Sequence, residues 1–155
     1  MVKITIVAVG KDKDRWVSDG VAHYTKLLSR WASVRILTPV VKTAASLSPV
    51  EVKRLEADAL RPHLGDGVCI ALADTGKICD SPLFAKTVER YSITGGGRVT
   101  FLIGGAYGLD ESILSGATEV LSLSPLTFSH QLVRLVLLEQ LYRGFSILHG
   151  TDYHK

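Results

Sequence analysis

A group of side chains suited to binding RNA lies in the last third of the chain. Arginine, lysine and histidine contact phosphate oxygens, and aromatic rings stack on unpaired bases. Taken singly, each of these residues is ordinary for a helix surface or a chain end. Together they place cationic and aromatic groups beside one loop and at the end of the chain, a composition that suits nucleic acid. They are His130, Arg134, Arg143, His149, Tyr153, His154 and Lys155.

Three loops that follow predicted strands are candidates for a small-molecule site, because ligands of open α/β sheets bind outside the carboxyl ends of the strands. Leu72 closes one strand, before the polar run 73–77. The glycine-rich run 104–108 follows a second strand and allows a ligand to approach the backbone closely, although a tight turn would explain the same glycines. The third loop, residues 123–128, is polar and contains a proline. Its backbone N–H and C=O groups could read the edge of an adenine.

Several common catalytic motifs are absent from the sequence. There is no GxxxxGK[ST] phosphate loop, and the single Gly10 after the first strand does not make a GxGxxG dinucleotide fingerprint. Neither GxSxG nor HExxH occurs. Cys69 and Cys79 form no CxxC pair and no Cys/His ligand set, so we expect two ordinary thiols and no metal site.

Length and composition predict a single globular domain spanning residues 1–155. Hydrophobic residues make up 46% of the chain and charged residues 21%, and no apolar run reaches the ~20 residues that span a bilayer. The first residues read as a strand rather than a signal peptide, so we expect a cytoplasmic protein without a membrane partner. A net charge of +3 permits an RNA partner without requiring one.

Strand and helix patterns alternate along the whole chain, which predicts an α/β fold with a parallel sheet and helices on both faces. Ser48, Pro49 and Glu51 together make a helix start with a capping box. A turn is expected at residues 65–67, and Asp12, Asp14 and Asp19 are expected to be solvated. The predicted strands are 2–9, 34–37, 68–73, 99–103 and 120–123; the predicted helices are 16–31, 49–64, 82–91, 110–114 and 129–145.

The last predicted helix, 129–145, is apolar on nearly every side rather than along one stripe. A surface helix of a small monomer buries only one side, so a helix of this kind needs a second cover. We therefore expect a homodimer formed through this helix. The alternative is a helix central to the core of a monomer.

Longer stretches of the sequence carry a family resemblance. They are ITIVAVGK at 4–11, FLIGGAYGL at 101–109, LSLSPLTFSHQLVRLVLLEQLYRGFSILHG at 121–150 and the terminal YHK. The chain resembles the RlmH family over nearly its whole length, most strongly after Leu102. This family comprises SPOUT-class methyltransferases that modify N3 of a pseudouridine in bacterial large-subunit (23S) ribosomal RNA on the assembled ribosome.

The resemblance implies a deep trefoil knot in the C-terminal part of the domain, a homodimer, and S-adenosylmethionine as cofactor. One departure is that relatives usually carry an acidic residue directly after the leucine equivalent to Leu72, whereas here Ala73 follows and Asp74 comes next. The implied RNA-facing residues are His130, Arg134, Tyr142 or Arg143, Tyr153, His154 and Lys155. The implied cofactor residues are Leu72, Gly104, Leu123, Ser124, Pro125, Leu126, Thr127 and Phe128.

Transfer of a methyl group to N3 requires loss of a weakly acidic proton, so a base or a local positive charge would help. We hypothesise His154 as the base, because histidine titrates near neutral pH, with Arg134 or Lys155 stabilising the anionic nucleobase. Alternatively, the tail only holds the RNA. Two other functions also remain open: a ribosome-associated RNA-binding module without transfer activity, and a methyltransferase for another RNA.

Overall fold

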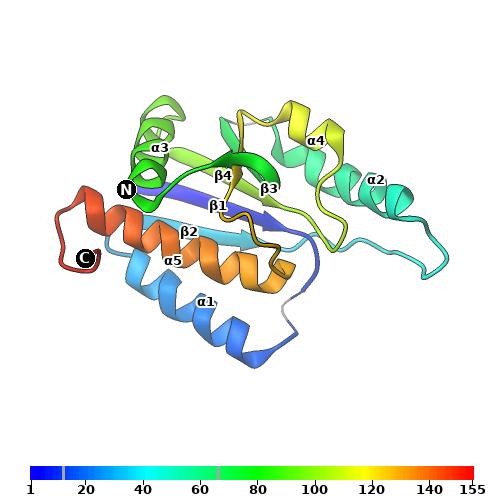
Figure 1. Cartoon of the computed structure of the whole chain (residues 1–155), viewed down its shortest axis with the longest axis horizontal. Helices are drawn as coiled ribbons and strands as arrows, with labels where there is room; N and C mark the ends of the chain where they lie inside the picture. Colours follow the sequence, from blue (N-terminus) through cyan, green and yellow to red (C-terminus); the bar gives the residue numbers. More distant parts are fainter. Residues whose placement is uncertain (12, 66) are drawn as a thin grey trace.

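Five strands form one parallel sheet in the computed structural model, which describes residues 1–11, 13–65 and 67–155 (Figure 1). Across the sheet the strand order is β2-β1-β4-β3-β5. The parallel α/β fold expected from the sequence is therefore confirmed. In chain order the elements are β1 (Val2–Ala8), α1 (Arg15–Leu28), β2 (Ala32–Leu37), α2 (Pro49–Leu60), the 3₁₀ turn η1 (Arg61–His63), β3 (Val68–Ile78), α3 (Ser81–Thr94), β4 (Arg98–Ile103), α4 (Glu111–Gly116), β5 (Glu119–Ser122) and α5 (His130–Leu148).

Helices cover both faces of the sheet, because alternate side chains of each strand point to opposite faces. Ile4 and Ile6 of β1 pack with Phe101 of β4 in a core that also contains α1, α3 and α5. Val7 and Leu102, from the same two strands, pack in a second core with α2 and α4. Figure 1 shows α5 lying between α1 and α3, with α2 and α4 grouped apart from them.

The start of α2 follows the expected capping box. The Ser48 Oγ accepts a hydrogen bond from the Glu51 N–H at 3.3 Å, and the Glu51 carboxylate accepts one from the Ser48 N–H at 2.8 Å. The helix ends at Leu60 rather than at residue 64, and a short 3₁₀ turn follows. Pro62 explains the difference, because proline lacks the N–H that continues an α-helix and its ring clashes with the preceding turn.

Other boundaries differ from the expectation by a few residues. The last helix is α5, which extends to Leu148 instead of residue 145, and Ser129 caps its start by accepting a hydrogen bond from the Leu132 N–H at 3.3 Å. Helix α1 ends at Leu28 rather than at residue 31, and Trp16 at its start is 56% exposed.

The most consequential difference from the expected boundaries concerns β3. This strand does not end at residue 73 but runs to Ile78. Its pairing with β5 is interrupted: Leu72 and Lys77 both pair with Leu121, and residues 73–76 leave the ladder between them. The glycine in this segment permits a close approach rather than a turn. A Cβ at Gly76 would lie 2.5 Å from the carbonyl carbon of Leu121.

Both cysteines are free thiols, as expected. Burial raises the pKa of the Cys69 thiol to about 11. Within the described part of the chain, no three histidine, cysteine or acidic side chains come together as a metal site, and every helix is too short or too polar to cross a membrane.

Asp14 and Asp19 are exposed, as expected for solvated charges. The same expectation for Asp12, and the centre of the turn expected at residues 65–67, lie outside the described residues.

Candidate cofactor cavity and chain-end cluster

A cavity of about 490 Å³ opens at the carboxyl ends of the central strands, a size typical of small-molecule sites. We call it the cofactor cavity. Three loops enclose it: the segment 73–76 that leaves β3, the glycine loop 104–108 after β4, and the loop 123–128 before α5. Lys53 of α2 and His130 and Val133 of α5 also line it.

The structure brings together almost all of the residues that the sequence analysis assigned to a cofactor. Pro125 is the exception, since it is exposed and does not line the cavity. Ala73 and Asp74 both line the wall, so the departure from the family pattern falls within the site itself. The assigned residues that line the cavity are Leu72, Gly104, Leu123, Ser124, Leu126, Thr127 and Phe128.

The glycine loop 104–108 is both a tight turn and a wall of the cavity, so the two interpretations of its glycines hold together. The Gly108 N–H donates to the Gly105 carbonyl at 3.1 Å, and Gly108 has a φ of +80°, a conformation that favours glycine. A Cβ at Gly104 would lie 2.8 Å from the Gly108 carbonyl carbon. The absence of side chains at Gly104 and Gly108 therefore permits both the turn and close access to the backbone of the loop.

The loop 123–128 is shaped by Ser122 and Ser124. The Ser122 hydroxyl donates to the Ser124 carbonyl at 2.9 Å, and the Ser124 hydroxyl accepts from the Leu126 N–H at 3.0 Å. These two bonds hold the loop in a defined turn before α5 begins. Preorganised backbone of this kind can present N–H and C=O groups to a ligand at little entropic cost.

His130 connects the cavity to the first strand. It is the first residue of α5 and lines the cavity, and a Cβ at Gly10 would lie 3.5 Å from its Nε2 atom. Among the residues assigned to RNA, His130 is the one that lines the cavity.

Arg134 is placed differently from the expectation that it faces RNA. Its side chain is fully buried, and its Nη2 donates to the carbonyl of Val9 at 2.9 Å and to that of Gly10. A guanidinium with its donors directed at two backbone carbonyls positions the segment after β1. In the single chain, Arg134 is therefore buried against the segment after β1 rather than exposed at the surface, and its assignment to the nucleobase stays a prediction.

A second group of functional candidates, the chain-end cluster, consists of Glu139, Arg143, Tyr153 and His154. The Glu139 Oε1 accepts from Arg143 Nη2 at 2.7 Å and from the Tyr153 hydroxyl at 3.1 Å. The Arg143 guanidinium lies over the Tyr153 ring at 4.8 Å, and its Nη1 lies 3.3 Å from His154 Nδ1. Desolvation, followed by hydrogen bonds to Tyr24 and Glu139, raises the pKa of Tyr153. The tail is therefore folded against α5.

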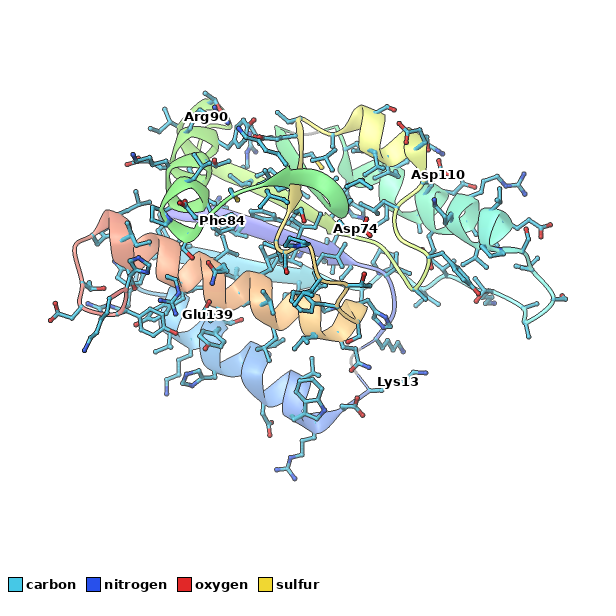
Figure 2. The ribbon with its side chains drawn as sticks, in the orientation of Figure 1. Lys13, Asp74, Phe84, Arg90, Asp110 and Glu139 are labelled. Atoms are coloured by element: carbon cyan, nitrogen blue, oxygen red, sulfur yellow. The ribbon has the colours of Figure 1, made fainter. Side chains whose placement is uncertain are left out.

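The cofactor cavity and the chain-end cluster lie toward opposite ends of α5. His130 and Arg143 are separated along the helix by about 20 Å, at 1.5 Å per residue. Figure 2 shows Asp74 beside the loops of the cavity and Glu139 farther along α5, toward the chain end. Within one chain, the tail residues Tyr153, His154 and Lys155 do not line the cavity.

Two acidic residues of these sites were not identified from the sequence. Glu139 stands four residues before Arg143, a spacing that predicts an ion pair on a helix and that could have identified it. Glu56 of α2 is 7% exposed and accepts a hydrogen bond from the Gly105 N–H at 3.2 Å. Its position in the sequence carries no comparable signal, because an acidic residue in an amphipathic helix is ordinarily solvated.

Comparison with known proteins agrees with this arrangement. A family described as "Predicted SPOUT methyltransferase" matches residues 2–154. A solved structure of a probable methylase family protein from Haemophilus influenzae Rd KW20 aligns with a TM-score of 0.57 at 12% identity. It covers 99% of this chain and 70% of that one, and this likeness concerns the fold alone.

A parallel α/β sheet, a cavity at its carboxyl edge and the family match together define a SPOUT methyltransferase. The chain belongs to the same family as the proteins named ribosomal RNA large subunit methyltransferase H. That of Acetivibrio thermocellus is 40% identical over an alignment of 159 residues. The alignment covers 99% of this chain and 100% of the relative. That of Listeria monocytogenes is 42% identical with the same coverage. The resemblance noted in the sequence is thus confirmed.

Proposed function

We propose that the protein methylates N3 of a pseudouridine in bacterial large-subunit ribosomal RNA, using S-adenosylmethionine and acting on the assembled ribosome. The observation that carries this proposal is the cofactor cavity, where His130 meets the loops that the family resemblance assigns to the cofactor. The names of the relatives, ribosomal RNA large subunit methyltransferase H, support the substrate class. A ribosomal substrate also supports a cytoplasmic location.

The residues of the cavity fit S-adenosylmethionine. A volume of about 490 Å³ admits a nucleoside with an amino-acid chain. The loop 123–128 offers backbone polar groups for the adenine, and Leu72 and Leu123 offer apolar walls. Glycines at 104 and 105 leave room for close approach of the ligand to the backbone.

When bound, S-adenosylmethionine supplies a methyl group already activated by its sulfonium. The protein therefore has to position the accepting nitrogen in line with the C–S bond and to receive the N3 proton. In this transfer the N–C bond would form as the C–S bond of the donor breaks, and the donor's sulfur would keep the electron pair. The presence of His130 in the cavity wall supports a role for it in this positioning. We assign His154 as the proton acceptor and Lys155 as the group that stabilises the anionic base.

Because the chain end lies about 20 Å along α5 from the cavity, His154 and Lys155 reach a cavity only if they come from another subunit. We therefore propose a homodimer formed through α5, in which the tail of one subunit completes the cavity of the other. Helix α5 keeps Leu132 and Val136 partly exposed in the single chain, which supports a further cover on this helix. Contacts with α1 and α3 already bury much of α5, as the monomer-core alternative requires.

We further propose that the segment leading into α5 is threaded as the deep trefoil knot implied by the family resemblance. Convergence of three loops from distant parts of the sequence on one cavity supports this arrangement. The RNA-facing residues His130, Arg143 and Tyr153 would then gather around the cavity from two subunits.

The test is to incubate the protein with intact ribosomes that lack the modification, supply methyl-labelled S-adenosylmethionine, and map the labelled nucleotide. Label at N3 of a large-subunit pseudouridine is the expected result. Label at another nucleotide would indicate a different RNA substrate. Binding of ribosomes without label would favour an RNA-binding module that has no transfer activity.

A further inference from the structure

The carboxyl group of Glu56 packs against the backbone of the glycine loop and does not itself line the cavity. Its Oε2 accepts the Gly105 N–H at 3.2 Å, and a Cβ built on Gly105 would lie 2.3 Å from Oε1. Helix α2 thus contacts the glycine loop backbone directly, and a side chain at residue 105 would require the Glu56 carboxyl group to move. A shift of this carboxyl group would move the wall of the cavity.

Burial of Glu56 is costly, and the mechanism does not use its acidity. The side chain is 7% exposed, and burial raises its pKa while the hydrogen bond from Gly105 lowers it. An apolar side chain at this position would avoid the desolvation cost. The acidic side chain is therefore best explained by the one contact that an apolar residue could not make, the bond to Gly105.

The same face of α2 reaches the cavity itself. Lys53 lines the cavity and lies three residues before Glu56, a spacing that puts both side chains on one side of the helix. Gly105 and its neighbours Gly104 and Ala106 also line the cavity. Helix α2 is therefore placed to hold the glycine loop where that loop lines the cavity.

We propose that Glu56 is a positioning residue that holds the glycine loop in the shape that binds the methyl donor. This inference rests on the function proposed above, because it assumes that the cavity binds S-adenosylmethionine. Glu56 contacts only the loop backbone, so its role is in cofactor affinity rather than in proton transfer.

The test compares two replacements of similar length in the full-length protein. Glu56→Gln keeps an oxygen acceptor for the Gly105 N–H, whereas Glu56→Met removes it. The Kd for S-adenosylhomocysteine, measured by calorimetry, should rise about tenfold in Glu56→Met, as expected for loss of one hydrogen bond to a charged group. It should stay within about twofold of wild type in Glu56→Gln. Gly105→Ala disturbs the same contact from the loop side and should weaken binding similarly.

Hydrogen exchange of the amides of residues 104–108 in the ligand-free protein gives a second readout. It should accelerate in Glu56→Met and remain close to wild type in Glu56→Gln. Glu51→Ala is the matched control, since it removes an exposed carboxylate from the same helix. This control should lower the Tm and leave the Kd unchanged.

The inference would be overturned if Glu56→Met kept the wild-type Kd and the wild-type hydrogen exchange, and Gly105→Ala also kept the wild-type Kd. Equal weakening by Gln and Met would overturn it too, because the acceptor would then not matter. If the wild-type protein itself fails to bind S-adenosylhomocysteine, the proposed function fails. Hydrogen exchange would still decide whether Glu56 holds the loop.

Discussion

The hydroxyl of Tyr153 donates a hydrogen bond to the Oε1 of Glu139 at 3.1 Å, which ties the end of the chain to α5. The same carboxylate oxygen accepts from Arg143 at 2.7 Å, so one residue organises a cation and an aromatic ring. If these groups meet RNA beside the cavity of a partner subunit, their geometry is set before the substrate arrives. This preorganisation lowers the entropic cost of binding.

Replacement of Glu139 by glutamine should therefore reduce methyl transfer to ribosomes without weakening cofactor binding. We expect a loss of about tenfold in kcat/KM, because neutralising the carboxylate weakens two charge-assisted contacts. Methyl transfer and the Kd for S-adenosylhomocysteine are measured side by side. Glu89→Gln, an exposed position on α3, is the control. A parallel loss of cofactor affinity would contradict separate roles for the two sites.

Arg134→Met should destabilise the fold. The substitution removes the donors to the Val9 and Gly10 carbonyls from a fully buried site, at a cost of about 1–3 kcal/mol in the free energy of unfolding. Urea denaturation measures this change. Arg15→Met removes a side chain that is 93% exposed and should be neutral. Unchanged stability in Arg134→Met, with lost RNA binding, would instead support the assignment of Arg134 to RNA.

Gly104→Ala should weaken cofactor binding at least tenfold. The added Cβ would lie 2.8 Å from the Gly108 carbonyl carbon, so the glycine loop must move. The measurement is the rise in Tm produced by saturating S-adenosylhomocysteine. For an intact site, ligand at 100 times the Kd stabilises the folded protein by about 2.7 kcal/mol. In Gly65→Ala the new Cβ meets no atom within 4 Å, so the full shift should remain. An equal shift in both variants would count against the glycine loop as a cofactor wall.

The buried carboxyl of Glu56 should make stability depend on pH in a defined direction. Burial raises its pKa above the ordinary value of 4.5, so the folded protein binds this proton more tightly than the unfolded chain does. The wild-type protein therefore loses stability, relative to Glu56→Gln, as the pH rises from about 4.5 through the folded-state pKa. Urea denaturation of both proteins between pH 4 and 8 tests this. A wild-type protein that gains stability relative to Glu56→Gln as the pH rises would show that the sign is wrong.

Mixing two inactive subunits should restore methyl transfer if the site is shared. Thr127→Trp fills the cavity, and a chain lacking residues 153–155 has no tail. Each variant alone should be inactive on ribosomes. An equimolar mixture should recover about a quarter of wild-type activity, because half of randomly assorted dimers carry one intact composite site. Absence of recovery, with mixed dimers shown to form, would mean that each tail serves its own cavity.

Hydrophobic periodicity predicted the order of strands and helices well, because burial on both faces of the sheet demands continuous apolar runs. It also placed the three loops that enclose the cavity. The extension of β3 was missed, because Ala73–Gly76 reads locally as a turn. Only pairing with Leu121, distant in sequence, shows it to be an interrupted strand. Local patterns carry no information about such long-range pairing.

Arg134 and Glu56 show the same limit for side chains. Their types favour solvent exposure, so local pattern could not predict that one is fully buried against Val9 and Gly10 and the other against Gly105. All three hydrogen bonds join residues far apart in the chain. The sequence did locate the loops of the site, but not the residues that hold those loops from behind.

The interruption in β3 separates the residues that set the register of the sheet from the residues that line the cavity. Leu72 and Lys77 pair with the same residue of β5, so the ladder resumes where it stopped, whatever path residues 73–76 take between them. Changes in composition or length within this segment therefore need not shift the register of the sheet. The cavity wall can vary between relatives while the core stays constant, which makes this segment a natural place for ligand preference to diverge.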